Sequence, residues 1–182
     1  MIGTALMGLV FHQCTHAVKG WHEKVSKYEC ARQEADMLGK PLLVIGGPWG
    51  SGVSGRIFGM KAHGCGDLCV DIDPDSCAGC PYQDADITDL PFEDKEFGAV
   101  FCSHVLEHMP DVQALQSAWS ELHRVADTVF ICVPVKWLIV HWLVPDHYLW
   151  VTQVGESVLQ VEERGAGTKY LVDQYGPPKQ IV

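Results

Sequence analysis

Residues 84–111, DADITDLPFEDKEFGAVFCSHVLEHMPD, contain a turn, an apolar run and the start of a helix. The turn Asp94-Lys95-Glu96 precedes the apolar residues 99–102, which are typical of a strand buried on both faces. Polar side chains follow directly, namely Ser103, His104, Glu107 and His108. Because open α/β sheets bind ligands at the carboxyl ends of their strands, this order predicts a ligand site after residue 102.

From residue 41 onward, short apolar runs alternate with helical segments. This pattern predicts an α/β fold, a Rossmann-like three-layer sandwich with a mostly parallel central sheet. We expect strands at residues 42–45, 68–72, 83–87, 99–103 and 128–133, and helices at 52–61 and 112–125. Residues 157–163 and 169–173 flank a Gly-Ala-Gly turn and predict an antiparallel C-terminal hairpin. The expected organisation is an N-terminal helical segment (1–40), one domain (41–176) and a loose tail (177–182).

Composition limits both size and partners. A chain of 182 residues with 47% hydrophobic and 20% charged residues has room for one globular core. The net charge of -10 argues against nucleic-acid binding, which depends on Lys and Arg neutralising phosphates. A small or uncharged substrate fits better.

The N-terminal segment leaves two readings open. Residues 1–11 are apolar but too few to span a membrane, and they lack the basic start of a signal peptide. They fit either an interfacial anchor or a packing helix. Residues 21–38 have helical spacing and end at Gly39, so we expect a leading helix against the sheet.

A glycine-rich loop, GGPWGSG, follows the first predicted strand at residues 46–52. Glycines permit a sharp turn and close backbone approach to a ligand, and the next helix start presents N–H groups to it. Residues 50–55 also match the G-x-G-x-x-G dinucleotide fingerprint, which suggests an NAD enzyme. In dinucleotide enzymes this fingerprint begins where the strand ends, whereas here it begins several residues later, so the match to NAD enzymes is weak. A third alternative is a tight glycine turn that binds no ligand.

Two carboxylates follow predicted strands. Asp71 ends the second strand, where a carboxylate can accept hydrogen bonds from both ribose hydroxyls of NAD or of another nucleoside cofactor. Asp86 follows the third, where it would either read adenine or cap the turn before Leu90-Pro91.

The order of these features resembles class I S-adenosylmethionine-dependent methyltransferases, over about residues 41–135. The family has an acidic residue before a Leu-Pro-Phe turn, then a strand, then a Glu-His pair, which here are Asp86, residues 90–92 and 107–108. Two positions depart from the pattern. Gly98 replaces an Asp that often follows the aromatic residue, and Val44 replaces an acidic residue near the cofactor's ammonium group.

The resemblance implies S-adenosylmethionine as cofactor and a hairpin at the sheet edge. Asp71 would bind the ribose, Ile72 would contact adenine, and Asp86 with the backbone N–H of Ile87 would read the adenine edge. The implied cofactor residues are Gly46, Gly47, Gly50, Gly52, Asp71, Ile72, Asp86, Ile87 and Ser103.

Two histidines are candidates for catalysis. Methyl transfer depends mainly on alignment, and a base matters only if the acceptor must lose a proton. His104 and His108 lie in the right region and share one helical face, with Glu107 beside them to orient or cap. For His108 a structural role, anchoring the helix, is the favoured reading.

The substrate region is expected at residues 135–152, which mix aromatic walls with His141, Asp146 and His147. Its apolar residues fit core packing as well, and its aromatic residues fit a membrane or partner surface.

Eight cysteines are present, and Cys77-Ala-Gly-Cys80 has metal-ligand spacing with Cys65 and Cys69 upstream. The alternative is small buried hydrophobes beside a loop. We expect reduced thiols and no metal site.

The sequence thus predicts methyl transfer to a small-molecule or lipid-like acceptor by a cytoplasmic protein, with peripheral membrane contact through the N-terminus left open. The alternatives are an NAD-dependent oxidoreductase and a non-catalytic methyltransferase-like binding module. Neither the acceptor atom nor the oligomeric state is indicated.

Overall fold

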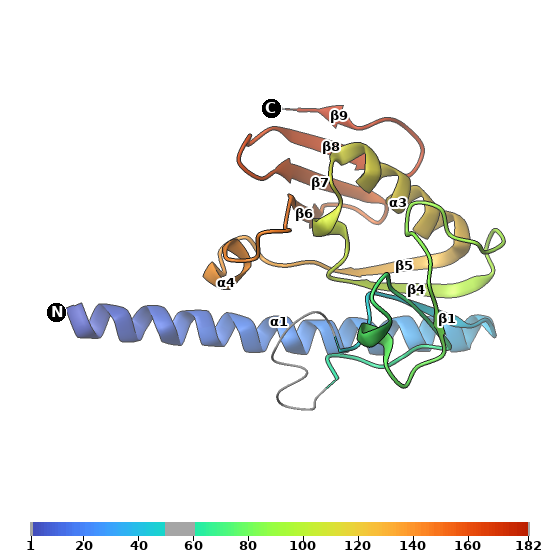
Figure 1. Cartoon of the computed structure of the whole chain (residues 1–182), viewed down its shortest axis with the longest axis horizontal. Coiled ribbons are helices and arrows are strands. Elements are labelled where there is room, and N and C mark those ends of the chain that lie inside the picture. Colours follow the sequence, from blue (N-terminus) through green and yellow to red (C-terminus); the bar gives the residue numbers. More distant parts are fainter. Residues whose placement is uncertain (1, 50–60, 182) are drawn as a thin grey trace.

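The computed structural model describes residues 2–49 and 61–181. A five-stranded parallel sheet forms its centre, in the order β3-β2-β1-β4-β5 (Figure 1). Its strands are β1 (Leu42–Ile45), β2 (Leu68–Val70), β3 (Tyr82–Gln83), β4 (Phe97–Ser103) and β5 (Ala126–Cys132). The strand order reverses between β1 and β4, and ligands bind beyond the carboxyl ends of strands at such a point.

Side chains of the central strands alternate between two cores, as the period of a strand requires. Leu42 and Val44 of β1 face helix α1 (Ile2–Leu38). Leu43 and Ile45 face the opposite core, which includes helix α3 (Val112–Val125). The predicted α/β fold with a mostly parallel, doubly covered sheet is confirmed.

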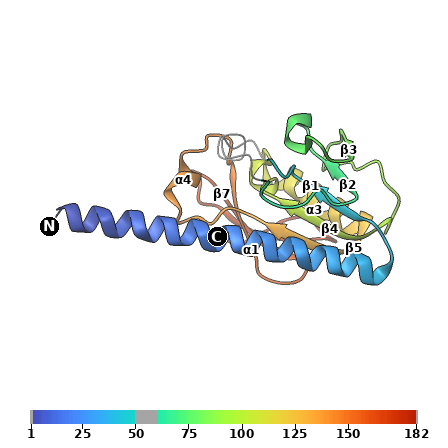
Figure 2. The ribbon, with the colours of Figure 1, turned by 90° about the horizontal axis from the view of Figure 1, so that it is seen from below.

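Helix α1 is longer than the leading helix expected at residues 21–38, because it also contains residues 2–20. It ends at Gly39, whose φ of 63° is the left-handed conformation that a glycine stop provides. Figure 2 shows α1 lying along the sheet. A Cβ atom at Gly98 of β4 would be 2.9 Å from the Cα atom of Ala35, so the glycine that departs from the family pattern lets α1 pack closely over β4.

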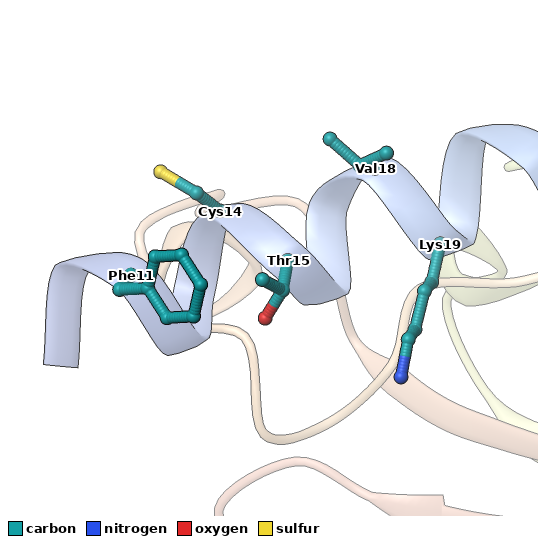
Figure 3. A pocket seen from close by; sticks show the side chains of 5 residues that line it. All are labelled: Phe11, Cys14, Thr15, Val18 and Lys19. Carbon is teal, nitrogen blue, oxygen red and sulfur yellow. The ribbon is translucent and has the colours of Figure 1, made fainter. Parts of the chain in front are cut away.

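The N-terminal half of α1 extends beyond the sheet (Figures 1 and 2). Its exposed face carries Met7, Phe11 and Val18. Figure 3 shows a shallow hollow along this part of the helix, lined by Phe11, Cys14, Thr15, Val18 and Lys19. Within residues 2–49 and 61–181, none of the helices has the length and apolar character that crossing a bilayer requires.

A second, antiparallel sheet covers the outer side of α3 (Figure 1). It contains β6 (Leu149–Gln153), β7 (Val158–Glu163), β8 (Lys169–Asp173) and β9 (Lys179–Gln180). Trp119 Nε1 of α3 donates a hydrogen bond to the Ser157 carbonyl (2.9 Å), and Gln116 donates to the Asp173 carbonyl. The predicted hairpin is therefore present as β7 and β8, but α3 holds it in a separate sheet and not at the edge of the parallel sheet.

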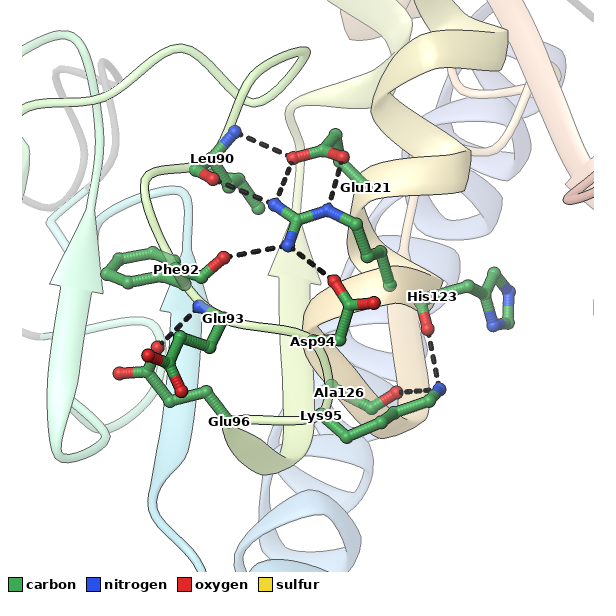
Figure 4. Close-up of polar contacts among 10 residues, drawn as sticks. Leu90, Phe92, Glu93, Asp94, Lys95, Glu96, Glu121, His123 and Ala126 are labelled. Carbon is green, nitrogen blue, oxygen red and sulfur yellow. Dashed lines mark hydrogen bonds and ion pairs between the residues drawn. The ribbon is translucent and has the colours of Figure 1, made fainter.

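Arg124 fixes the turn that precedes β4, and Figure 4 shows the residues that it binds, Leu90, Phe92, Asp94 and Glu121. Its guanidinium donates to the carbonyls of Leu90 and Phe92 at 2.8 and 2.7 Å and pairs with Glu121 and Asp94. Glu121 in turn accepts a hydrogen bond from the Leu90 N–H (2.8 Å). The Leu-Pro-Phe turn is thus held to the end of α3, which aligns the start of β4.

The element bounds follow the sequence closely at β1 and α3, while two other predictions differ and a third falls largely outside the described residues. The third strand was expected at 83–87 but is only Tyr82–Gln83, because Asp86 and the residues after it form a turn. The tail expected to be loose includes β9, which pairs with β8. The helix expected at 52–61 lies outside the described residues except for Lys61.

The prediction of reduced thiols is wrong for four of the eight cysteines. Disulfides join Cys65 to Cys80 and Cys69 to Cys77, so the segment before β2 is linked to the turn after η1 (Pro74–Cys77), and β2 itself is linked to η1. A short segment that is cross-linked by disulfides therefore connects β2 to β3.

Candidate active site

The carboxyl ends of β1 and β2 are joined by a hydrogen bond at the predicted cofactor edge. The Gly47 N–H donates to Asp71 Oδ2 (2.8 Å), and the Asp73 N–H donates to Asp71 Oδ1 (2.9 Å). Gly46 continues the β1–β2 pairing by donating to the Val70 carbonyl (3.0 Å). The carboxylate of Asp71 is therefore fixed in position beside the glycine turn.

Both described glycines are required by packing within the chain. Gly46 has a φ of 86°, and a Cβ atom there would lie 2.3 Å from the Ser103 carbonyl oxygen. A Cβ atom at Gly47 would lie 2.2 Å from the backbone of Ser76. The expected reason for these glycines was close approach to a ligand, whereas the contacts in the structure are with β4 and η1. Gly50 and Gly52 lie outside the described residues.

The side chains at this edge fit an adenosine. Each Asp71 oxygen accepts one hydrogen bond from the chain, and a carboxylate oxygen has room for a second, as ribose hydroxyls would need. Ile72 follows directly with 82% of its surface exposed. An exposed aliphatic side chain next to a held carboxylate offers an apolar contact for a base.

Asp86 has the contacts of a turn residue. Its Oδ1 accepts hydrogen bonds from the Thr88 N–H and hydroxyl, both at 2.8 Å. This is the turn-capping alternative that the sequence left open. The side chain of Ile87 is buried in the α3-side core, and Ser103 is buried at the end of β4.

A buried carboxylate and histidines gather beyond the end of β4. His104 has a φ of 55°, which is strained for a residue other than glycine. Its Nδ1 lies 3.1 Å from Oε1 of Glu107, which belongs to η2 (Leu106–His108) and is fully buried. His147 Nε2 lies 4.0 Å from the same oxygen.

The substrate segment supplies the other half of this cluster. His108 Nδ1 lies 3.0 Å from the Asp146 carbonyl and 3.3 Å from its Oδ2, so His108 anchors η2 to that segment. His141, in α4 (Ile139–Trp142), has its ring centre 6.2 Å from that of His104 and 5.9 Å from that of His147. The structure therefore brings the predicted catalytic and substrate residues together. We call Glu107 with His104, His108, His141 and His147 the histidine cluster.

Burial and charge set the protonation of the histidine cluster. Burial acts to raise the pKa of Glu107, but the contact with His104 and the nearby His108 outweigh it and lower that pKa. Burial lowers the pKa of His141 to about 4 and also lowers that of His147. At neutral pH the cluster thus holds an ionised carboxylate and at least two neutral imidazoles.

Two residues of this site were not assigned a site role from the sequence. Glu107 was named only as a neighbour of the histidines, although its spacing of three from His104 could have indicated the contact. Arg164, in the turn between β7 and β8, donates to the carbonyls of Val144 and His147 at 2.6 and 3.1 Å. Arg164 positions the substrate segment, but the two are far apart in the sequence, so no local sequence pattern indicates this contact.

Comparisons with known proteins give one family match and several solved structures of low similarity. Residues 49–128 match the family model of the methyltransferase domain. No curated protein matches the sequence. The chain is similar to a solved protein of Pyrococcus horikoshii OT3, with 18% identity, a TM-score of 0.42, and coverage of 84% of this chain and 75% of the other.

Two further solved structures are named as methyltransferases. A sugar N-methyltransferase from Streptoalloteichus is 16% identical, with a TM-score of 0.41 and coverage of 85% and 66% of the two chains. An S-adenosylmethionine-dependent methyltransferase from Clostridium acetobutylicum is 12% identical, with a TM-score of 0.40 and coverage of 77% and 63%. The chain spans less than two thirds of the length of these two proteins.

A parallel sheet with a glycine turn after β1 and a carboxylate after β2 defines an α/β domain of the nucleotide-binding type. The family match covers residues 49–128, which is less than half of the chain. This part of the chain therefore matches a methyltransferase domain, which is consistent with the class I S-adenosylmethionine-dependent methyltransferases that the sequence resembles.

Proposed function

We propose that this chain binds S-adenosylmethionine at the carboxyl edge of the parallel sheet and transfers its methyl group to a small-molecule or lipid-like acceptor. The observation that carries the proposal is the Asp71 carboxylate, which is held by Gly47 at the edge that also bears the histidine cluster. When bound, the cofactor supplies a methyl group already activated on a sulfonium.

The residues proposed to hold the cofactor follow β1, β2, β3 and β4. Asp71 accepts hydrogen bonds from the ribose, and Ile72 provides an apolar contact for adenine. Asp86 retains its Oδ2 for the adenine amino group while Oδ1 caps the turn, and the Ile87 N–H faces the ring. The remaining proposed contacts are Gly46, Gly47, Ser103 and, outside the described residues, Gly50 and Gly52.

The histidine cluster is proposed to bind and orient the acceptor. His104 is the candidate for a base, because it follows β4 directly and its Nδ1 is oriented by Glu107. His108 is committed to Asp146, which favours a positioning role. His141 and His147 are neutral at pH 7 and offer nitrogen atoms that can accept a hydrogen bond from an acceptor hydroxyl or amine.

Calorimetric titration with S-adenosylmethionine and S-adenosylhomocysteine tests the cofactor. A hydrogen bond to a charged group contributes about 1.5–3 kcal/mol, so Asp71→Ala should weaken binding about 10-fold to 100-fold. Glu29→Ala, which removes an exposed carboxylate on α1, is the charge-matched control. Tight binding of NAD with no binding of either sulfur compound would instead favour the oxidoreductase, and cofactor binding without turnover on any acceptor would favour the binding module.

Peripheral membrane contact of a cytoplasmic protein is proposed for the N-terminus. The support is the exposed apolar face of α1, with Met7, Phe11 and Val18. Co-sedimentation with phospholipid vesicles should fall when Phe11 is replaced by Asp, and equal recovery of both proteins in the supernatant would contradict the contact.

A further inference from the structure

Three side chains of the histidine cluster have the arrangement of metal ligands. Glu107, His108 and His147 each offer one ligand atom, and these atoms lie within 4.8 Å of one another. Two come from η2 and one from the segment between α4 and β6, so the chain brings them together over nearly forty residues. Metal ligands with bonds of about 2.0–2.2 Å lie somewhat closer to each other than this, and side-chain rotation supplies the difference.

Glu107 and His147 of this group have buried polar atoms without a hydrogen bond of good geometry among the described residues. Neither Glu107 oxygen has a hydrogen bond of good geometry within residues 2–49 and 61–181, and Nδ1 of His147 is in the same state. Glu107 is fully buried and His147 is 5% exposed. A buried carboxylate costs several kcal/mol unless it is paired or coordinates a metal, and a cation would stabilise Glu107 beyond its contact with His104 Nδ1, which lies 3.1 Å from Oε1.

The surroundings support the ligands as an outer shell would. His108 directs Nδ1 to Asp146, which leaves its Nε2 as the nitrogen for a metal. Arg164 binds the carbonyl of His147 and so fixes the segment that carries this ligand. His104 lies 3.1 Å from Glu107 Oε1 and orients the carboxylate.

We propose that Glu107, His108 and His147 bind one divalent transition-metal ion, of the kind that prefers two imidazole nitrogens and one carboxylate oxygen. Zn²⁺ suits this ligand set, and three protein ligands leave a position open for a further oxygen or nitrogen. One further step rests on the proposed function: the open position binds the acceptor heteroatom that receives the methyl group. The sequence expected no metal because it considered only the cysteines as ligands.

Cobalt binding provides the test. The full, untagged chain is treated with a chelator and titrated with Co²⁺, whose visible absorption reports coordination by nitrogen and oxygen. We expect one Co²⁺ per chain, displaced by Zn²⁺, and at least a 10-fold loss of affinity in both Glu107→Gln and His147→Ala. His123→Ala is the matched control, because His123 Nε2 is also buried with no hydrogen-bond partner among the described residues, but it lies on α3 against Trp119. It should bind Co²⁺ as the wild type does.

Several results would overturn the site. These are no cobalt spectrum in the wild-type chain, unchanged affinity in both ligand variants, equal loss in His123→Ala, or the charge-transfer bands of thiolate ligands. Thermal unfolding of each variant shows whether it is folded, and the wild-type titration decides the question even if a variant is not. Titration of the same chelated sample with S-adenosylhomocysteine separates the two proposals, because binding of the nucleoside without cobalt overturns the metal site alone, and binding of cobalt without the nucleoside overturns the proposed function alone.

Discussion

Acidification should destabilise this protein through a buried histidine beneath α1. His63 is 7% exposed, and its ring centre lies 6.0 Å from that of Tyr28 and 5.0 Å from that of Phe101. Burial, reinforced by the charges of Lys24 and His104 and opposed by the contact with the Gly64 carbonyl, lowers the pKa of His63 from 6.5 to about 4. The unfolded chain therefore takes up this proton before the folded chain does, and the free energy of unfolding falls as the pH drops from about 6.5 to about 4.

The size of the effect follows from the two pKa values. One pKa unit corresponds to about 1.4 kcal/mol, so His63 contributes about 2 kcal/mol of lost stability between pH 7.5 and pH 5. Urea unfolding of the wild type and of His63→Phe at both pH values measures it. The decrease should be smaller by about 2 kcal/mol in His63→Phe, whereas Tyr28→Phe, a neighbour that keeps the histidine, should behave like the wild type. Equal decreases in the wild type and His63→Phe would refute the reasoning.

Three further predictions concern packing and covalent structure. Gly98→Ala should lower the free energy of unfolding by about 1–3 kcal/mol, because the added Cβ would press on Ala35. Gly155→Ala is the control, and it should change the free energy of unfolding by less than about 0.5 kcal/mol, because the nearest atom to its Cβ would be 3.5 Å away. Similar losses in both variants would contradict close packing of α1. Iodoacetamide in denaturant should modify four cysteines before reduction and eight after it, as read by intact mass, and eight modified without reductant would show that the two disulfides are absent. Arg164 binds three backbone carbonyls in residues 142–147, so Arg164→Met should speed amide hydrogen exchange there and leave the exchange rates of α3 unchanged. Unaltered exchange at residues 142–147 would contradict a positioning role for Arg164.

Local patterns were enough to predict the parallel sheet and much of the site. The apolar run of β1 and the amphipathic α3 were bounded correctly, because each is determined by burial of its own side chains. His104, Glu107 and His108 were placed correctly after β4, but the helical face expected to carry both histidines is not formed, because His104 has a left-handed backbone conformation and η2 contains only Leu106–His108.

Features that depend on contacts between distant residues were not predicted. The pairing of Cys65 with Cys80 and the reach of Arg164 to the substrate segment depend on the folded geometry. The second sheet also needed such contacts, since Trp119 and Gln116 bind it to α3 through backbone carbonyls that no sequence pattern identifies. The role of Gly98 became visible only when α1 was seen above it.

A crystal structure of the protein with S-adenosylhomocysteine tests the central claim most directly. The account predicts the ribose hydroxyls on the Asp71 carboxylate, the adenine beside Ile72, and the sulfur directed toward the histidine cluster. A nucleoside bound away from Asp71, or a sulfur atom directed away from His104 and His147, would contradict it.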